Sequence, residues 1–305
     1  MRLRQLALLA AVVAALAAVG LLVAGRVPAT GGPTAEGDST GHFEQPRDQA
    51  DAAGRAMKAT VRAQAPAPLN APATRGAAGR KDPLPASSPL AAAEAEPSPA
   101  IGPLFYTTGG VPAHGCTASV VHSPRGDLIA TAAHCVHTGG FRTDIAFVPG
   151  YRDGAAPYGV WVPVSVDVAP EWADDRDPDH DVAFLRMRPV EGSARLERVT
   201  GAERVRFDPP RERPTRVLGY PNEAERPVSC QNATAAESGT QQRFDCERLP
   251  NGTSGSPFLT DVDASTGLGT LVGVLGGKDE GGDEETSYSP YLGRAAEKLY
   301  ERAAR

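Results

Sequence analysis

From residue 116 onward the chain consists mainly of short runs of β-branched and apolar residues, separated by segments that contain Gly, Pro and Asp. Such runs predict short strands. Long amphipathic helices do not alternate with them, which argues against a doubly wound α/β fold. The runs lie at 116–121, 128–132, 145–149, 160–168, 182–187, 215–219, 257–259 and 270–275. The pattern predicts an all-β barrel or sandwich fold.

A helical pattern lies near the end of the chain. Its apolar residues recur at spacings of three or four and would form one face of a helix. These residues are Leu292, Ala295, Ala296, Leu299 and Tyr300. We expect a C-terminal helix that packs on the last barrel.

The N-terminal residues have a different composition. Arg2 and Arg4 precede an uncharged apolar run at residues 6–25, and the sequence Val27-Pro-Ala29 lies shortly after it. This is the pattern of a secretory signal peptide. About 20 apolar residues could also span a bilayer as an uncleaved anchor. Residues 1–29 are therefore a signal peptide or a membrane anchor, and under both interpretations the rest of the chain leaves the cytoplasm.

Residues 30–100 are rich in Ala, Pro and Gly and nearly lack aromatic side chains. So little apolar surface cannot offset an ordering cost of about 1–2 kcal/mol per residue. We expect this segment to be disordered, either as a linker or spacer or as a pro-segment. The folded domain would then comprise residues 101–305.

The cysteines and the charge limit the possible partners. Cys116, Cys135, Cys230 and Cys246 all lie in the expected domain. An even number of cysteines in an exported chain predicts two disulfides, and no pair has C-x-x-C metal-site spacing. The formal net charge of −6 and the lack of a basic patch argue against nucleic acid as a partner. We expect a monomer with no cofactor and no bound metal.

His134 is the histidine best placed for chemistry. It lies in Thr131-Ala-Ala-His-Cys135, at the end of an apolar strand whose small residues allow close backbone approach. A general base needs a fixed position, because proton transfer requires a reach of about 2.6–3.2 Å. The alternative is a buried structural histidine beside a disulfide.

Asp181 directly precedes a predicted strand with little polar content. Its carboxylate could therefore be drawn into a buried site, where it would hold the tautomer of a histidine and stabilise the imidazolium. The alternative is an ordinary acidic residue before a strand. The other acidic residues nearby suggest a solvated loop; they are Asp174, Asp175, Asp177 and Asp179.

Ser254 lies in Gly252-Thr-Ser-Gly-Ser-Pro257. The glycines allow a sharp turn that leaves the hydroxyl accessible. The N–H groups of Gly252 and Ser254 could then form an oxyanion hole, in which the loss of one donor costs about 2.7–4 kcal/mol. An ordinary Gly/Ser turn is the alternative. Ser256 is a weaker nucleophile candidate, because Pro257 rather than a glycine follows it.

The order His, Asp, Ser along the chain differs from the Ser, Asp, His order of α/β-hydrolases, whose serine lies in G-x-S-x-G. In this order and in its β pattern, the sequence resembles the trypsin-like, chymotrypsin-fold serine peptidases. Within them it is similar to the bacterial branch related to the glutamyl endopeptidases. The motifs that carry the resemblance span residues 101–305 and are Cys116–Val121, Thr131–Cys135, Asp181–Leu185, Leu218–Pro221 and Gly252–Pro257.

This resemblance implies two six-stranded antiparallel β-barrels with the catalytic residues in the cleft between them. It also implies a Cys116–Cys135 bridge, which leaves Cys230 and Cys246 as the second pair. The expected activity is that of a secreted serine endopeptidase, which hydrolyses protein or peptide substrates through a Ser-His-Asp triad and an acyl-enzyme. A protease-like extracellular binding module without turnover is the alternative, but it would usually lack one of the three residues.

The sequence departs from the family pattern in its activation and specificity residues. Thr253 stands where animal digestive members have an aspartate that pairs with a newly cut N-terminus, so that mode of activation is not expected, although Ile101 resembles such a terminus. Leu249 and Val274 stand near the positions of a threonine and a histidine in glutamyl-specific relatives, so glutamate preference is not expected. Arg248, near the position of the pocket floor, could favour acidic substrates or extend into solvent.

An acidic loop at residues 278–285 should border the substrate cleft. A mobile, solvated loop is the simplest interpretation. Calcium binding through its carboxylates and attraction of basic substrates are the alternatives.

Overall fold

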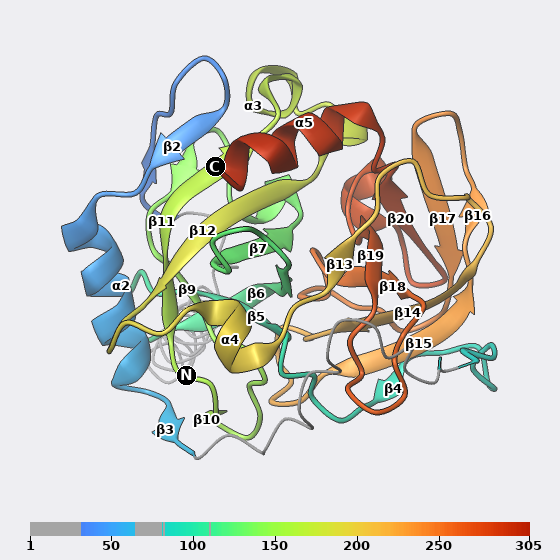
Figure 1. The fold of residues 1–305 in the computed structure, drawn as a ribbon, viewed down its shortest axis with the longest axis horizontal. Coiled ribbons are helices and arrows are strands. Elements are labelled where there is room, and N and C mark those ends of the chain that lie inside the picture. Colours follow the sequence, from blue (N-terminus) through green and yellow to red (C-terminus); the bar gives the residue numbers. More distant parts are fainter. Residues whose placement is uncertain (1–31, 65–80, 82, 110) are drawn as a thin grey trace, which may run out of the picture. The chain divides into compact units, whose positions relative to one another are not determined.

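Six antiparallel strands close into the first barrel. They are β5 (Ile101–Tyr106), β6 (Ala113–Val121), β7 (Leu128–Thr131), β9 (Ile145–Phe147), β11 (Trp161–Val168) and β12 (Ala183–Pro189). The ring runs β12-β7-β6-β5-β9-β11 and closes because β11 also pairs with β12. This computed structural model describes residues 32–64, 81, 83–109 and 111–305, and residues 33–305 form one compact unit (Figure 1).

The second half of the fold consists of a six-stranded sheet and a three-stranded sheet. The first contains β4 (Ala93–Glu94), β13 (Arg204–Val205), β14 (Pro214–Gly219), β15 (Val228–Ala233), β18 (Pro257–Thr260) and β19 (Thr270–Val274). The second contains β16 (Ala235–Ala236), β17 (Gln241–Asp245) and β20 (Thr286–Pro290). The predicted all-β, chymotrypsin-like fold with a C-terminal helix is confirmed, and each of the eight predicted runs corresponds to a strand.

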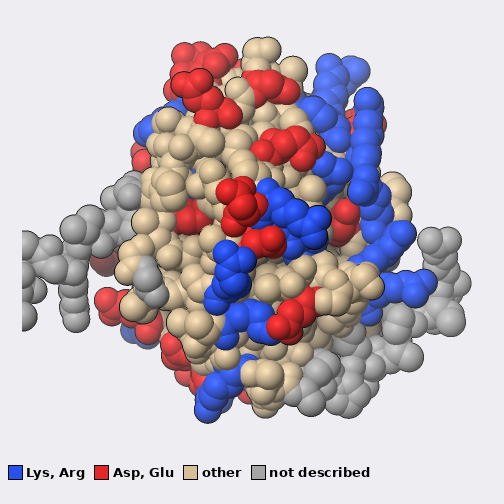
Figure 2. Space-filling view, turned by 90° about the vertical axis from the view of Figure 1, so that its left-hand side faces the viewer, with Lys and Arg blue, Asp and Glu red and all other residues tan. Residues whose placement is uncertain are grey.

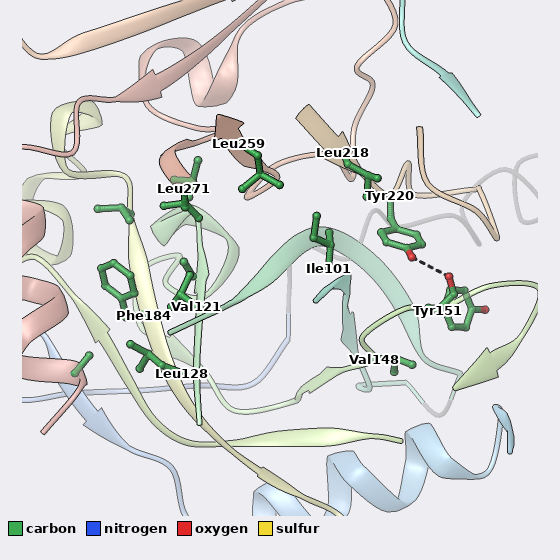
Figure 3. Packing of buried hydrophobic residues seen from close by; sticks show 14 of the residues in the cluster. Ile101, Val121, Leu128, Val148, Tyr151, Phe184, Leu218, Tyr220, Leu259 and Leu271 are labelled. Atoms are coloured by element: carbon green, nitrogen blue, oxygen red, sulfur yellow. Dashed lines mark hydrogen bonds between the residues drawn. The ribbon is translucent and has the colours of Figure 1, made fainter. Parts of the chain in front are cut away.

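One apolar cluster contains side chains from both halves of the fold (Figure 3). Ile101 and Val121 come from the first barrel, and Leu259 and Leu271 come from the second. All four are buried, and full burial of such a side chain contributes about 1.5–3 kcal/mol. The Tyr220 hydroxyl also donates a hydrogen bond to the backbone oxygen of Tyr151 at 2.8 Å (Figure 3). The two halves are therefore held in a fixed relation around the cleft.

The structure joins Cys116 to Cys135 and Cys230 to Cys246, the pairs that the resemblance implies. The first disulfide connects β6 to the short helix η1 (Ala133–Cys135). The second connects β15 to the residue that follows β17. Each half of the fold thus has one covalent link.

Residues 33–64 form an N-terminal strap around the first barrel. β1 (Thr34–Ala35) pairs with β8 (Phe141–Arg142), β2 (His42–Glu44) pairs with β11, and β3 (Arg62–Ala63) pairs with β10 (Ala155–Ala156). Between them, α2 (Arg47–Lys58) lies along the barrel (Figure 1).

The helix α2 explains why the strap is ordered. Its buried residues are spaced three or four apart, on one face: Ala50, Ala53, Gly54 and Met57. A Cβ on Gly54 would lie 2.5 Å from a methyl group of Val190, so glycine permits the close approach. These small apolar groups could not form a core alone, but the barrel supplies the surface that they cover.

The outer face of the strap is charged and carries both signs. Lys58 contacts Glu191, and Arg188 contacts Asp51 at 2.5 Å. Basic and acidic side chains interleave over this side of the molecule (Figure 2). Such exposed pairs contribute little to stability. The helix is therefore held by its buried face.

Residues 83–100 continue along the second half of the fold before entering the first barrel. β4 pairs with β15, and the N–H of Ala92 donates to the carbonyl of Glu247 at 2.7 Å. The carbonyl of Ala100 accepts from the N–H of Val120 at 2.7 Å. The prediction that residues 30–100 are disordered is thus wrong for 32–64 and 83–100, because their backbone groups pair with the barrels. The predicted signal or anchor at 1–29 lies outside the described residues.

The C-terminal helix α5 (Arg294–Ala303) is present, but it packs on the first barrel (Figure 1). Its Tyr300 ring contacts Phe184 of β12, and Arg302 Nε donates to Asp167 Oδ1 of β11 at 2.8 Å. The expectation that it covers the last barrel is wrong, because its apolar face meets β11 and β12 instead. Ala295, expected on that face, is exposed.

The remaining short helices are α3 (Pro170–Asp175), α4 (Leu196–Thr200), η2 (Pro178–His180) and η3 (Lys278–Gly281). Within the described ranges, no helix has the length and apolar character needed to cross a membrane.

Candidate active site

His134 lies in η1, directly after β7, and the neighbouring Cys135 fixes it to β6. Ala132 and Ala133 before it are fully buried, so this part of the chain packs tightly into the barrel. The imidazole itself keeps 17% of its surface exposed. The ring is therefore held rigidly and still reaches the cleft.

Asp181 is fully buried and its carboxylate accepts three hydrogen bonds. Oδ1 accepts from the backbone N–H of His134 at 2.8 Å. Oδ2 lies 2.8 Å from His134 Nδ1 and accepts from the N–H of Gly277 at 2.7 Å. These contacts orient the imidazole, with Nδ1 toward Asp181 and Nε2 free for the cleft.

The charges of the pair reinforce one another. Burial acts to raise the pKa of Asp181, but the adjacent His134 and the hydrogen bonds outweigh it and lower that pKa. Burial acts to lower the pKa of His134, but the Asp181 carboxylate outweighs it and raises that pKa. An ionised Asp181 thus favours proton uptake by His134.

Ser254 lies in a turn whose glycines adopt conformations that other residues avoid. Gly252 has φ +100° and Gly255 has φ +80°. A Cβ on Gly252 would lie 2.3 Å from the backbone nitrogen of Asn222, and one on Gly255 would lie 2.1 Å from Thr131 Oγ1. The turn therefore requires glycine on both sides of the serine.

Thr117 of β6 ties this turn to the first barrel. Its backbone N–H donates to the carbonyl of Ser254 at 2.7 Å, and its hydroxyl donates to the carbonyl of Gly252 at 3.0 Å. Thr117 Oγ1 also accepts from the N–H of Tyr220 at 2.8 Å. Both turn carbonyls are thus held against the first barrel. The sequence motif around Thr117 was noted, but this role was not predicted.

The N–H groups of Gly252 and Ser254 donate to no other described residue. Ser254 is partly exposed, and its hydroxyl is not hydrogen-bonded to the described imidazole of His134. Such contacts are often long before substrate is bound. The turn therefore combines one partly exposed hydroxyl with two backbone donors that are unused among the described residues, a combination suited to attack on a carbonyl and to stabilisation of an oxyanion.

Ser256, the weaker nucleophile candidate, is fully buried. Its Oγ has no hydrogen-bond partner in the described part of the chain and packs against Gly219, where an added Cβ would lie 1.9 Å away. No substrate can reach it in this position.

A cavity of about 760 Å³ adjoins Ser254. Leu249 and Leu275 contribute apolar wall, and Arg248 lies at its edge as an exposed side chain. Five carboxylates also line it, from Glu247, Glu280, Asp283, Glu284 and Glu285. The acidic loop thus borders the candidate site, as expected from the sequence.

Metal binding at this site finds no support among the described residues. The one cluster of potential ligand atoms comprises Cys116, Cys135 and His134. Both sulfur atoms belong to the disulfide, so neither is a thiolate that could bind metal. The carboxylates of the acidic loop form no comparable cluster within the described ranges.

Comparisons with known proteins agree with this geometry. A family model described as a trypsin-like peptidase domain matches residues 116–274, more than half of the chain. The protease Anisep from Arthrobacter nicotinovorans is similar in structure, with a TM-score of 0.61 and 28% identity; the match covers 69% of this chain and 98% of Anisep. The thermostable serine protease AL20 from an extremophilic microorganism has a TM-score of 0.58 and 27% identity, covering 68% and 97%.

A Glu endopeptidase solved in complex with MPD shares the fold, with a TM-score of 0.54 and 18% identity over 70% of this chain and 96% of that one. No curated protein sequence matches the chain. The family model, the double-barrel fold and the solved serine proteases lead to one conclusion: the chain belongs to the family of trypsin-like, chymotrypsin-fold serine peptidases.

Proposed function

We propose that this chain is a secreted endopeptidase that cleaves peptide bonds through Ser254, His134 and Asp181. The observation that carries the proposal is the buried Asp181 carboxylate, 2.8 Å from His134 Nδ1, together with a glycine-dependent turn in which Ser254 is partly exposed. Two disulfides support export, because such bonds persist in oxidising compartments.

In the first half of the reaction, Ser254 Oγ attacks the carbonyl carbon of the peptide and His134 Nε2 accepts the hydroxyl proton. Asp181 holds the imidazolium through Nδ1. The N–H groups of Gly252 and Ser254 donate to the oxyanion. When the intermediate collapses, the C–N bond breaks and His134 returns the proton to the leaving amine. An ester between Ser254 and the acyl group remains.

In the second half, a water molecule attacks the ester carbonyl and His134 accepts a proton from it. Collapse of this intermediate breaks the bond to Oγ, and His134 returns the proton to Ser254. The products are the new carboxyl and amino ends of the substrate, and the enzyme is restored.

We infer that the strap at 33–64 and residues 83–100 stay with the active enzyme rather than being removed as a pro-segment. Ile101 begins a buried strand, and the carbonyl of Ala100 before it is already hydrogen-bonded. Thr253 donates its hydroxyl to the carbonyl of Pro250 at 2.8 Å. No new N-terminus is needed to order the turn of Ser254.

Glutamate preference is not part of the proposal. Five carboxylates and one arginine line the cavity beside Ser254, and an acidic substrate side chain would be repelled there. Leu249 in its wall offers no side-chain donor to a substrate carboxylate.

The test is the hydrolysis of an unfolded protein substrate by Ser254→Ala. We expect turnover to fall by several orders of magnitude, and His134→Ala to fall as far. Ser256→Ala is the matched control. It also removes a serine hydroxyl, two residues from Ser254, but this hydroxyl is buried and has no hydrogen-bond partner among the described residues. Retained hydrolysis in Ser254→Ala would refute the proposal and point to another nucleophile, whereas a wild-type chain that hydrolyses no substrate would favour the binding module.

A further inference from the structure

Gln241, the first residue of β17, has its side chain buried between the two loops that hold Asp181. One loop is η2 (Pro178–His180), which leads directly into Asp181. The other is the turn at Gly276 and Gly277, in which the N–H of Gly277 donates to Asp181 Oδ2. The Gln241 side chain is 4% exposed, so solvent does not compete for its contacts.

The amide nitrogen of Gln241 is used on the side of the first loop. Nε2 donates to the carbonyl of Pro178 at 2.9 Å and lies 2.8 Å from Asp179 Oδ1, to which it also donates. The N–H of Asp181 itself turns toward the carbonyl of Pro178, at 3.4 Å. The two amide hydrogens thus hold one backbone carbonyl and one side-chain carboxylate, two and three residues before Asp181.

The amide oxygen of Gln241 is used on the side of the second loop. Oε1 accepts from the N–H of Lys278 at 3.3 Å. A Cβ on Gly277 would lie only 2.4 Å from this oxygen, too close for any residue but glycine. Gly277 has φ +84°, a conformation that needs glycine. The Gln241 oxygen therefore packs behind Gly277 and holds the turn that aims its N–H at Asp181.

We propose that Gln241 is a positioning residue for catalysis, which clamps the loop before Asp181 to the turn at Gly277 and so fixes the Asp181 carboxylate against His134. This inference rests on the proposed function of His134 and Asp181. Gln241 touches no reacting atom, and it acts through the geometry of the pair. A misplacement of about 1 Å in such a group can cost about 100-fold in rate.

The test compares Gln241→Leu with Gln242→Leu in the full chain. Gln242 is the matched control: it is fully buried, follows Gln241 in β17, and donates to the carbonyl of Val272 at 2.9 Å. It has no hydrogen bond with either loop. Both variants remove a buried amide, but only Gln241→Leu disconnects the support of Asp181.

Three readouts separate positioning from general destabilisation. For Gln241→Leu we expect kcat to fall about 10-fold to 100-fold with KM unchanged. The acid limb of the kcat/KM profile should move to lower pH, because a weaker contact with Asp181 no longer raises the pKa of His134 as far. The low-field proton NMR signal of the His134 Nδ1–H hydrogen bond should shift or disappear. Gln242→Leu should leave all three readouts as in the wild type.

Gln241→Glu provides a second variant if the leucine variant fails to fold. It keeps the length and the acceptor for Lys278 but replaces the donating amide with a carboxylate that faces Asp179, so the fall in kcat and the change in the NMR signal are expected. Wild-type values in both Gln241 variants, or equal changes in Gln242→Leu, would overturn the proposal. If the wild-type chain hydrolyses no peptide, the proposed function fails, while the NMR signal still tests the positioning.

Discussion

The two halves of the fold hold their parts of the candidate site in different ways. The first barrel supplies His134 and Asp181, and it fixes them with side-chain hydrogen bonds in a buried setting. The second half supplies Ser254, the oxyanion donors and Gly277, and it presents them through turns with positive φ. The first half thus sets the charge of Asp181 and the tautomer of His134, whereas the second half sets the backbone conformation of the Ser254 turn.

This contrast extends to the surroundings of each half. The strap and α5 cover the first barrel, and Arg302 of α5 reaches the buried Asp167. The second half borders the cleft with the exposed acidic loop. The buried carboxylate of the candidate site thus lies in the covered half, and the exposed loop beside the cavity of Ser254 lies in the open half.

Asp181→Asn tests the first barrel most severely. An amide in place of the carboxylate would favour the wrong tautomer of His134 and would turn a donor toward the N–H of Gly277. We expect kcat to fall about 10⁴-fold, as expected for the loss of an ionised carboxylate behind the base. Steady-state kinetics on a peptide substrate measure this, and a loss of less than 10-fold would show that the charge of Asp181 is not used.

Removal of each disulfide separates stability from activity. By the chain-entropy model, each bond closes a loop that is worth about 3 kcal/mol. The paired change of Cys116 and Cys135 to serine should lower the stability and also kcat, because Cys135 adjoins His134. The change of Cys230 and Cys246 should lower mainly the stability. Urea unfolding and steady-state kinetics on both variants check this. An equal loss of kcat in the two variants would contradict a specific role of the Cys116–Cys135 bond in placing His134.

The buried Glu203 tests the contact between the halves through pH. Its N–H donates to Val120 and its carbonyl accepts from His122, while its side chain accepts from Gly269. Burial raises the pKa of Glu203 to about 7. The folded state therefore favours the protonated carboxyl. The contribution of this group to the unfolding free energy is complete below the pKa of the unfolded chain, near 4.3, and is lost as the pH rises through about 7.

From this shift we expect the unfolding free energy to fall by about 3 kcal/mol between pH 4.5 and pH 7.5 because of this one group. Glu203→Gln should remove that part of the pH dependence. Urea unfolding of both proteins at the two pH values measures it. An unchanged pH dependence in the variant would mean that Glu203 is already ionised in the folded protein.

Thr117→Val gives the smallest expected effect and tests the link between barrel and turn. The variant keeps the shape but leaves the N–H of Tyr220 and the carbonyl of Gly252 without their partner. We expect a loss of about 2 kcal/mol in stability and a decrease of about 10-fold in kcat. Retained kcat at reduced stability would show that the turn of Ser254 is rigid without the first barrel.

Much of the fold was predictable from local patterns, because runs such as those of β7 and β12 combine β-branched residues with clear turn signals. The strands that were missed carry weaker signals: β5 contains Gly102 and Pro103, and β17 begins with two glutamines. The strap was missed because Ala50, Ala53 and Gly54 show little hydrophobicity by themselves, and they are buried only because the barrel provides a surface.

The candidate site was predicted in part for a similar reason. His134, Asp181 and Ser254 were found through motif order and resemblance. Gly277 and Gln241 were not found, because they meet the loop of Asp181 from 96 and 62 positions away. The prediction of which barrel α5 covers was also wrong. The sequence of an amphipathic helix specifies its apolar face but not the surface on which that face packs.

The most direct test of the proposed chemistry is covalent labelling with a phosphonofluoridate, followed by mass spectrometry of the digested protein. We expect one modified residue, Ser254, with labelling of His134→Ala strongly slowed and labelling of Ser256→Ala unchanged. An unlabelled wild-type protein, or a label on another serine, would contradict the assignment of Ser254 as the nucleophile activated by His134.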